Sequence, residues 1–314
     1  MESIKWSDGH LQLIDQRLLP HKEQWITCQS VEDVAEAIAN MVVRGAPAIA
    51  IAGAYGMAMA VERGDNREMA QQQLLASRPT AVNLRWALER LQTISDTEVL
   101  AEAIRIHEED LEINLSLGEA GADLLEGGVL TICNTGALAT AGHGTALGMI
   151  RSAHRRQRNI HVYALETRPY LQGARLTAFE CVKEAIPCTL ITDGMAGALL
   201  ASGKIKAAVA GCDRVAANGD TANKIGTYQL AVLCHHHKIP FYIAMPTSTL
   251  DPRCPNGSSI PIEERPHEEV KSLHSVPIAP ASVEVWNPSF DITPAALITS
   301  WVTEHGIWHP PFPS

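Results

Sequence analysis

Asp213 and Lys224 have the residue types and spacing of a site that could act on an anionic ligand. Asp213 follows residues 207–211, which are small or branched and apolar and so predict a buried parallel strand. After a Gly-Asp turn, Asn223 and Lys224 are expected to begin an amphipathic helix. In open α/β sheets, ligand sites combine a carboxylate at a strand end with a helix start. We predict that Asp213 is catalytic and that Lys224 binds a phosphate.

Two cysteines are candidates for a reactive thiol. Cys133 ends an apolar run and precedes the Gly-containing turn 134–137, so we expect it at a helix N-terminus, where a thiolate is stabilised. Cys212 is expected to point to the opposite face from Asp213, because side chains alternate along a strand, and we interpret it as a small apolar filler. The seven cysteines form no CxxC motif, which argues against a zinc site and a disulfide framework.

Two arginines in the first third of the chain could hold an anion. Arg44 and Gly45 precede Pro47, which is typical of the first turn of a helix. Free backbone N–H groups and the Arg44 guanidinium would suit an anion there, and a close-packing turn explains the same residues equally well. Arg78 precedes a proline and is expected in an extended or turn conformation; alone, it is typical of a solvated surface arginine.

Two motifs imitate cofactor or metal sites. Gly142, Gly144 and Gly148, followed by Glu166, imitate a dinucleotide-binding fingerprint. We expect these glycines inside a helix, however, and not at the strand-to-helix turn that such binding needs. Residues 235–237 are three consecutive histidines, which point in different directions on a helix, so we interpret them as a helix C-terminus favoured by the dipole. Neither a metal nor an organic cofactor is expected.

Composition excludes several classes of function. With 46% hydrophobic and 19% charged residues, the 314-residue chain is globular. Its net charge of -10 argues against nucleic-acid binding, which needs a basic face. The longest apolar stretch, 46–61, is too short to span a bilayer. The first residues do not resemble a signal peptide, so we expect a cytoplasmic protein without a membrane partner.

The first part of the chain, residues 1–126, is predicted to be a mostly helical domain with a small β region. A Gly turn within residues 3–20 predicts a hairpin. Helices are expected over 30–43, with Ser30 as the cap, from Pro47, from Pro79 with Trp86 and Leu88 inward, and as one long helix from 95 followed by a short one.

The second part, residues 127–314, is predicted to be a Rossmann-like parallel-sheet domain, which makes the fold α/β. Apolar runs predict strands within 127–133, 159–166, 188–193, 207–212 and 240–245, and helices are expected at 139–156, 171–185, 194–201 and 222–238. Strands that alternate with helices indicate a parallel sheet covered on both faces. Functional residues of such sheets gather at the carboxyl ends of the strands. Polar or reactive groups follow all five runs, at 133–134, 166–168, 193, 213–214 and 246–248.

Long motifs in the chain resemble one known family. They are RGAPAI at 44–49, SRPTAVNL at 77–84, LTICNTGALATAGHGTALG at 130–148, ETRPYLQGARLTA at 166–178, GCDRVAANGDTANKIGTYQLA at 211–231 and NPSFDITPAALIT at 287–299. Together they strongly resemble the methylthioribose-1-phosphate isomerases of methionine salvage. That family is related to the regulatory subunits of a eukaryotic translation initiation factor. The resemblance covers nearly the whole chain.

The resemblance implies a role for particular residues. The family's catalytic cysteine falls on Cys133 and its catalytic aspartate on Asp213. Its phosphosugar contacts fall on Arg44, Gly45, Ala46, Arg78, Gln172, Asn223 and Lys224. A small phosphosugar substrate and a homodimer are implied as well.

The implied substrate constrains the chemistry. Because a 1-phosphate blocks the usual opening of an aldose, an acid must protonate the ring oxygen, and hydrogen must move from C2 to C1. We hypothesise that an apolar strand environment raises the pKa of Asp213, so that it acts as this acid. Cys133 would take the C2 proton as base, or stabilise the transition state.

Two other functions are compatible with the same sequence. One is a related isomerase that acts on 5-deoxyribose 1-phosphate or ribose 1,5-bisphosphate. The other is a non-catalytic regulatory relative, against which the presence of both Cys133 and Asp213 argues.

Overall fold

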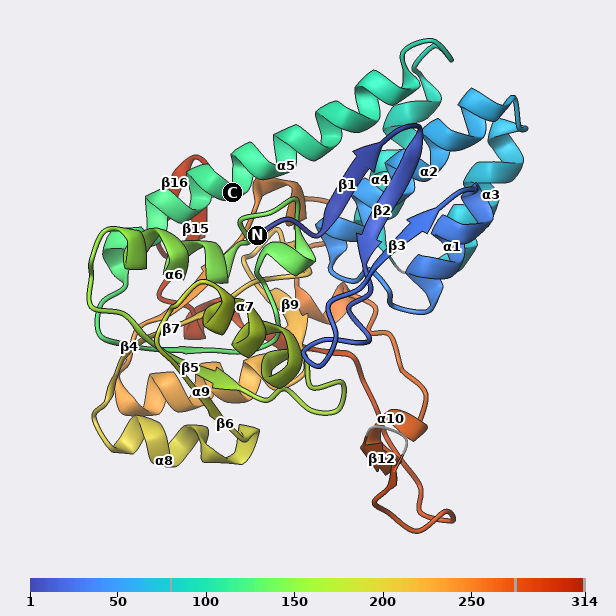
Figure 1. The fold of residues 1–314 in the computed structure, drawn as a ribbon. Coiled ribbons are helices and arrows are strands. Elements are labelled where there is room, and N and C mark those ends of the chain that lie inside the picture. The colour runs from blue at the N-terminus through green and yellow to red at the C-terminus, as the bar shows by residue number, and fades with distance from the viewer. Residues whose placement is uncertain (80, 274–275, 313–314) are drawn as a thin grey trace. The chain divides into compact units, whose positions relative to one another are not determined.

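The computed structural model describes residues 1–79, 81–273 and 276–312, which form two compact units (Figure 1). Unit 1 comprises Met1–Ser116 and Asn134–Gly148, and unit 2 comprises Leu117–Cys133 and Met149–Ser314. Because the segment from Asn134 returns to unit 1, the units do not correspond to a single cut in the chain. The predicted domain boundary between 126 and 127 therefore stays a prediction.

Unit 1 combines a small antiparallel sheet with helices, as predicted for the first part of the chain. Its sheet has the order β1-β2-β3, with β1 (Ile4–Ser7), β2 (His10–Ile14) and β3 (Trp25–Cys28). Its helices are α1 (Val31–Ala39), α2 (Ala46–Arg63), α3 (Arg67–Ser77), α4 (Val82–Gln92) and the first part of α5 (Val99–Gly121). The β1-β2 pair confirms the predicted hairpin.

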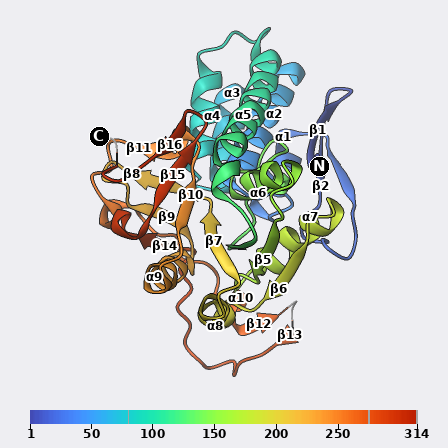
Figure 2. The ribbon, with the colours of Figure 1, turned by 90° about the vertical axis from the view of Figure 1, so that its left-hand side faces the viewer.

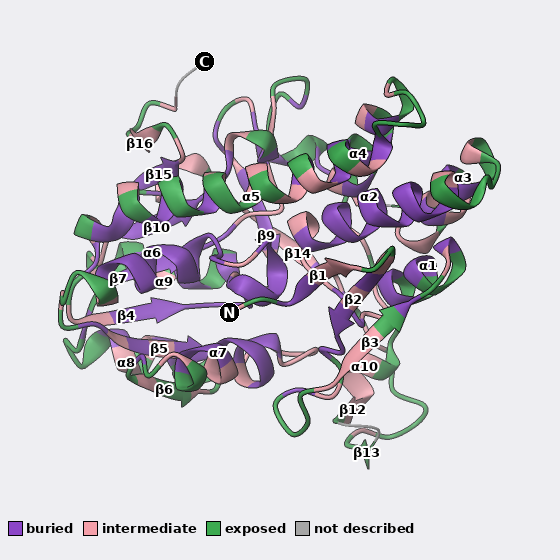
Figure 3. Ribbon diagram, turned by 45° about the horizontal axis from the view of Figure 1, so that its top comes forward, coloured by how far each residue is buried: buried purple, intermediate pink, exposed green. Residues whose placement is uncertain are grey.

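Local sequence signals explain these helices. The Ser30 side chain accepts a hydrogen bond from the Asp33 N–H at 3.2 Å, which confirms the predicted cap of α1. Helix α2 is buried from Ala48 to Ala60, so it forms the centre of unit 1 (Figure 3). The prediction that Trp86 points inward is wrong, since it is 44% exposed while Leu88 is fully buried. Two residues correspond to about 200° on a helix, so the two side chains lie on different faces.

Unit 2 contains a seven-stranded sheet of the order β16-β15-β10-β7-β4-β5-β6. Its strands are β4 (Gly128–Thr131), β5 (His161–Leu165), β6 (Cys188–Ile191), β7 (Ile205–Ala210), β10 (Phe241–Ala244), β15 (Ser300–Thr303) and β16 (Gly306–Trp308). The five predicted strands are all present and parallel. Strand β15 adds to them in parallel and β16 is antiparallel. The predicted α/β fold class is confirmed.

Helices cover both faces of this sheet. They are α6 (Ala146–Arg155), α7 (Ala178–Lys183), α8 (Ala196–Ala201) and α9 (Thr227–His237), with a π-helical turn at Gly173–Thr177 before α7. Helices α8 and α9 pack on one face, against residues such as Leu130 and Ile243, and α6 lies on the other side of the sheet (Figures 1 and 2). The histidines at 235–237 form the last turn of α9, as predicted.

The helix expected over 139–156 begins later, at Ala146. Gly142 has φ +154° and Gly144 has φ +94°, and a Cβ on Gly144 would lie 2.5 Å from the Gly136 Cα. Gly142 and Gly144 therefore allow a close loop, and the prediction that they lie inside a helix is wrong, whereas Gly148 lies within α6 as predicted. The prediction that Cys133 lies at a helix N-terminus is also wrong, because a loop with only a 3-10 turn precedes α6.

The helix expected over 222–238 also begins later, at Thr227. Before it, β9 (Thr221–Lys224) belongs to a second sheet of the order β11-β8-β9-β14, with β8 (Arg214–Ala216), β11 (Leu250–Asp251) and β14 (Phe290–Thr293). Asn223 lies opposite Asp291 and Lys224 opposite Phe290. The partner strand is about seventy residues away in the sequence, so local periodicity could not reveal the pairing.

Short elements complete the described chain. They are α10 (Glu268–Lys271), β12 (Ser272–Leu273), β13 (Val276–Pro277) and the 3-10 turns Ala122–Leu124, Ala137–Ala139, Asp193–Met195, Thr247–Thr249, Gly257–Ser259 and Ala295–Leu297. Among the helices of the described ranges, none has both the length and the apolar character needed to cross a membrane.

Candidate active site

Cys133 and Asp213 follow neighbouring strands of the large sheet. Strands β4 and β7 pair with Thr131 opposite Val209, and the Thr131 hydroxyl donates to the Val209 carbonyl at 2.8 Å. Cys133 comes two residues after β4 ends, and Asp213 three residues after β7 ends. The fold therefore brings a thiol and a carboxyl group from distant parts of the sequence to the carboxyl ends of adjacent strands.

Two side chains hold Cys133 in an unusual backbone conformation. Its φ is +67°, in the left-handed region that a residue with a Cβ rarely adopts. The Cys133 N–H donates to the Thr167 hydroxyl at 2.9 Å, and the Cys133 carbonyl accepts from the Thr177 hydroxyl at 2.7 Å. Cys133 as a whole is 7% exposed. Strained backbone that is held by its surroundings is typical of functional sites.

Gln172 contacts the thiol directly. Its amide Nε2 donates to the Cys133 Sγ at 3.4 Å, and its Oε1, which is buried, has no hydrogen-bond partner among the described residues. The residue after it must be glycine, since a Cβ on Gly173 would lie 1.8 Å from the Leu165 carbonyl oxygen. An amide with one donor on the thiol and an unused acceptor could orient a hydroxyl-bearing ligand beside Cys133.

Asp213 is half-buried and is held by the hairpin that follows it. Its N–H donates to the Ala222 carbonyl at 2.9 Å, so it lies beside β9. On that strand, the buried Asn223 donates from Nδ2 to the Thr227 hydroxyl at 2.9 Å. Asp213, which follows β7 of the large sheet, and Asn223, which lies on β9 of the four-stranded sheet, thus belong to segments that are hydrogen-bonded to each other.

Lys224 lies at the end of β9 and not at a helix start, which corrects the prediction for its local structure. Its Nζ donates to the Ser289 carbonyl at 2.9 Å and lies 4.4 Å from the centroid of the Phe290 ring. Both partners come from the segment around β14, which pairs with β9. The ammonium group is therefore held in a defined place.

In unit 1, Arg44 and Gly45 lie where α2 begins, as predicted. Gly45 has φ +98°, and a Cβ on it would lie 2.6 Å from the Ala139 carbonyl oxygen, so only glycine fits. The Arg44 guanidinium donates to the side-chain oxygen of Asn134 at 2.7 Å and to its carbonyl at 3.0 Å. Asn134 is the residue that follows Cys133 in the sequence. Arg44 is thereby fixed on the loop that leaves Cys133.

Ala46 is the first residue of α2, and Arg78 is the C-cap residue of α3. Arg78 has φ -150° and ψ 80°, which is not helical. Its carbonyl accepts from the Ala81 N–H at 3.0 Å, which is the hydrogen bond of a turn, one of the two predicted conformations, and the residue is half-buried.

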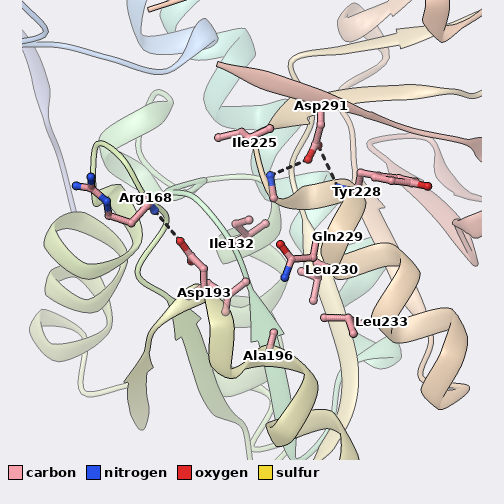
Figure 4. A pocket seen from close by; sticks show the side chains of 12 residues that line it. Ile132, Arg168, Asp193, Ala196, Ile225, Tyr228, Gln229, Leu230, Leu233 and Asp291 are labelled. Carbon is pink, nitrogen blue, oxygen red and sulfur yellow. Dashed lines mark hydrogen bonds between the residues drawn. The ribbon is translucent and has the colours of Figure 1, made fainter. Parts of the chain in front are cut away.

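A cavity of about 260 Å³ lies in unit 2 near the carboxyl ends of β4, β5 and β6, with Ile132, Leu165 and Asp193 in its wall. Its wall includes two carboxylates, and Figure 4 shows Asp193 directed toward the Arg168 backbone and Asp291 toward the first turn of α9. Burial raises the pKa of Asp291 to about 6, although the N–H groups of Tyr228 and Gly226 donate to it. Burial also raises the pKa of Cys212 to about 12.

Sequence reasoning missed the roles of Thr167, Thr177 and Asp193, which contact Cys133 or the turn that holds it. The rule that polar groups gather at strand ends includes Thr167 and Asp193 but gives neither a partner. Among the residues that the structure describes, no three His, Cys, Asp or Glu side chains are grouped so that they could hold a metal ion.

Comparisons with known proteins match this chain to one protein family over most of its length. The profile of the initiation factor 2 subunit family matches residues 42–310. A methylthioribose-1-phosphate isomerase from Alcanivorax borkumensis is 54% identical to this chain, with 98% of this chain and 94% of that protein aligned. A methylthioribose-1-phosphate isomerase from Pelotomaculum thermopropionicum is 50% identical, with 99% of this chain and 92% of that protein aligned.

Two solved structures are similar over nearly the whole chain. The 5-methylthioribose 1-phosphate isomerase of Pyrococcus horikoshii has a TM-score of 0.94 and 41% identity, covering 99% of this chain and 93% of that one. The structure described as translation initiation factor eIF-2B, subunit delta, from A. fulgidus has a TM-score of 0.88 and 44% identity, covering 99% and 96%.

Proposed function

This chain belongs to the initiation factor 2 subunit family and, within it, to the methylthioribose-1-phosphate isomerases, and from this we propose that it converts 5-methylthioribose 1-phosphate to 5-methylthioribulose 1-phosphate. The observation that carries the proposal is that Cys133 and Asp213 follow adjacent strands in a chain about half identical to enzymes of that name over nearly its full length. We propose further that it acts in methionine salvage, as a cytoplasmic homodimer.

We propose Asp213 as the acid. Its proton goes to the ring oxygen, the bond from that oxygen to C1 breaks, and C1 is left electron-poor beside the phosphate ester. The Cys133 thiolate then takes the proton from C2, which gives an enol between C1 and C2. The thiol returns that proton to C1, and the C2 hydroxyl proton returns to the Asp213 carboxylate as C2 becomes a ketone. Both groups end in their starting states.

The substrate contacts are also a proposal. In unit 1 we assign Arg44, Gly45, Ala46 and Arg78, supported by the fixed guanidinium of Arg44 and by the start of α2, where the cap residue Gly45 provides no side-chain hydrogen bond. In unit 2 we assign Gln172, Asn223 and Lys224. The unused buried acceptor of Gln172 and the hydrogen-bonded polar groups of Asn223 and Lys224 on β9 support these assignments. Binding energy from these contacts would position C1 and C2 for the reaction.

A second candidate is a regulatory role, which the similarity to the protein described as a subunit of translation initiation factor eIF-2B favours. A related isomerase that accepts another sugar phosphate is the third. One experiment separates them: the turnover of 5-methylthioribose 1-phosphate, 5-deoxyribose 1-phosphate and ribose 1,5-bisphosphate is measured with the same preparation. Absence of turnover with all three would refute an isomerase, and preference for either of the last two would refute the substrate.

Variants test the assigned roles. Asp213→Asn should abolish turnover and leave substrate binding nearly intact, because the amide cannot supply the proton. The matched control is Asp220→Asn, which changes a half-buried carboxylate that accepts backbone N–H groups of Gly257 and Ala295; it should retain activity. An active Asp213→Asn variant would remove the acid assignment. With deuterium at C2, loss of any part of the label to solvent supports Cys133 as base, because a thiol that holds the deuteron can exchange it before returning it to C1, whereas complete transfer to C1 supports hydride migration.

A further inference from the structure

Asp193 binds two consecutive backbone groups of a neighbouring loop. It lies just beyond β6, the edge strand that pairs with β5. One carboxylate oxygen accepts the Thr167 N–H at 2.9 Å, and the other accepts the Arg168 N–H at 2.8 Å. Figure 4 shows the carboxylate directed at this turn. The Cys133 thiol is contacted by Gln172, and the Cys133 backbone by Thr167 and Thr177, so an effect of Asp193 on Cys133 passes through the turn.

The turn that Asp193 holds is strained. Thr167 has φ +61°, and for a β-branched residue this is a genuine conformational outlier. Its hydroxyl donates to the Leu165 carbonyl at 3.1 Å and accepts the Cys133 N–H at 2.9 Å. Leu171, four residues on, also has a positive φ of 61°. The carboxylate offsets this strain, because it accepts two consecutive N–H groups of the turn in this conformation.

The consequence reaches the thiol through one residue. If the Thr167 backbone relaxed to negative φ, its hydroxyl would leave the Cys133 N–H. Cys133, itself at φ +67°, would then lose one of the contacts that keep it in the left-handed region. The thiol would move away from the Gln172 amide, which contacts Sγ at 3.4 Å.

We propose that Asp193 is a positioning residue for Cys133, acting through the Thr167 turn. The activity part of this proposal rests on the proposed function, since it takes Cys133 as a catalytic residue. The structural part does not need that function to be correct. The experiment below therefore has one readout that requires a substrate and one that does not.

The test uses Asp193→Asn, in which one oxygen that accepts an N–H is replaced by an NH₂ group. Hydrogen exchange of the full-length protein, read by mass spectrometry with fragmentation to single residues, should show the Cys133 amide exchanging at least about tenfold faster, while the amides of β4 are unchanged. With the substrate that the wild type turns over, kcat should fall about tenfold or more, and KM should change less than about threefold, because the reacting group and not the binding groups has moved.

Two further variants give the rescue and the control. Thr167→Val removes the hydroxyl and should reproduce both effects, whereas Thr167→Ser keeps it and should restore wild-type exchange at Cys133 and most of kcat. Glu304→Gln changes another carboxylate that accepts a backbone N–H, that of Thr247, three strands away from β4. It should alter neither readout.

Three results would overturn the proposal. They are wild-type exchange of the Cys133 amide in Asp193→Asn, an equal rise of exchange across β4, and an unchanged kcat despite faster exchange. A wild-type protein that turns over none of the sugar phosphates would refute the proposed function, and the exchange measurement would still decide whether Asp193 positions Cys133.

Discussion

Replacing Gln172 by leucine tests the chemistry of the thiol most directly. The amide Nε2 lies 3.4 Å from the Cys133 Sγ, and the side chain is 2% exposed. Leucine has nearly the volume of glutamine but carries no donor, so the change removes the contact to sulfur without opening a large cavity. The variant therefore separates stabilisation of a thiolate from simple packing.

The structure sets the size of the effect. A hydrogen bond to a charged group contributes about 1.5–3 kcal/mol, and a long contact to sulfur belongs at the lower end. About 1.4 kcal/mol is a factor of ten in rate, so alkylation of Cys133 by iodoacetamide at a fixed pH should slow roughly tenfold. Stability should not fall, because the amide oxygen of Gln172 is buried without a partner among the described residues, and such a group costs about 1–3 kcal/mol.

The assay follows the Cys133 peptide by mass spectrometry in the absence of substrate, with thermal unfolding measured alongside. Gln71→Leu is the matched control: Gln71 is a buried glutamine in α3 whose Oε1 accepts from the Gln92 amide. It should lower stability and leave alkylation of Cys133 unchanged. If Gln172→Leu alkylates Cys133 within about twofold of the wild-type rate, the amide does not stabilise a thiolate, and its role is confined to the substrate.

Two further predictions concern stability. Arg151 contacts Glu180 and Glu184 at 2.6 Å each, and the Arg151 and Glu180 side chains are almost completely buried. Removing one partner of a buried charge pair costs about 3–5 kcal/mol, so Glu180→Gln should lower the free energy of unfolding in urea by about 3 kcal/mol. A loss of less than about 1 kcal/mol would contradict this prediction. Burial raises the pKa of Asp110 to about 6, although the Ala141 N–H donates to it. A raised folded-state pKa gives stability that is present at low pH and is lost as the pH rises through about 6, so the stability of wild type relative to Asp110→Asn should fall by about 2 kcal/mol between pH 4.5 and pH 7. Unfolding curves at the two pH values check this, and a constant difference would refute it.

The fold was predictable where neighbouring residues determine it. The five parallel strands are short apolar runs that lie between helices, and each of them is present at its expected place. Strand β9 was not predictable, because what makes Asn223 and Lys224 extended is pairing with β14, which is distant in the sequence. The late start of α6 has a similar cause, since the backbone of Gly144 packs against Gly136 and keeps the loop out of a helix.

The candidate site shows the same division between local pattern and tertiary structure. The rule of strand ends selects Cys133 and Asp213, because the carboxyl ends of parallel strands lie at the same edge of the sheet. It does not reveal that Cys133 has a positive φ, and the partners of Cys133 follow from that angle. A cysteine with an ordinary extended backbone would not direct its backbone N–H at the Thr167 hydroxyl. The strain at Cys133 and the polar groups that offset it are therefore one feature, and a search for functional thiols gains more from backbone angles than from the sequence around the cysteine.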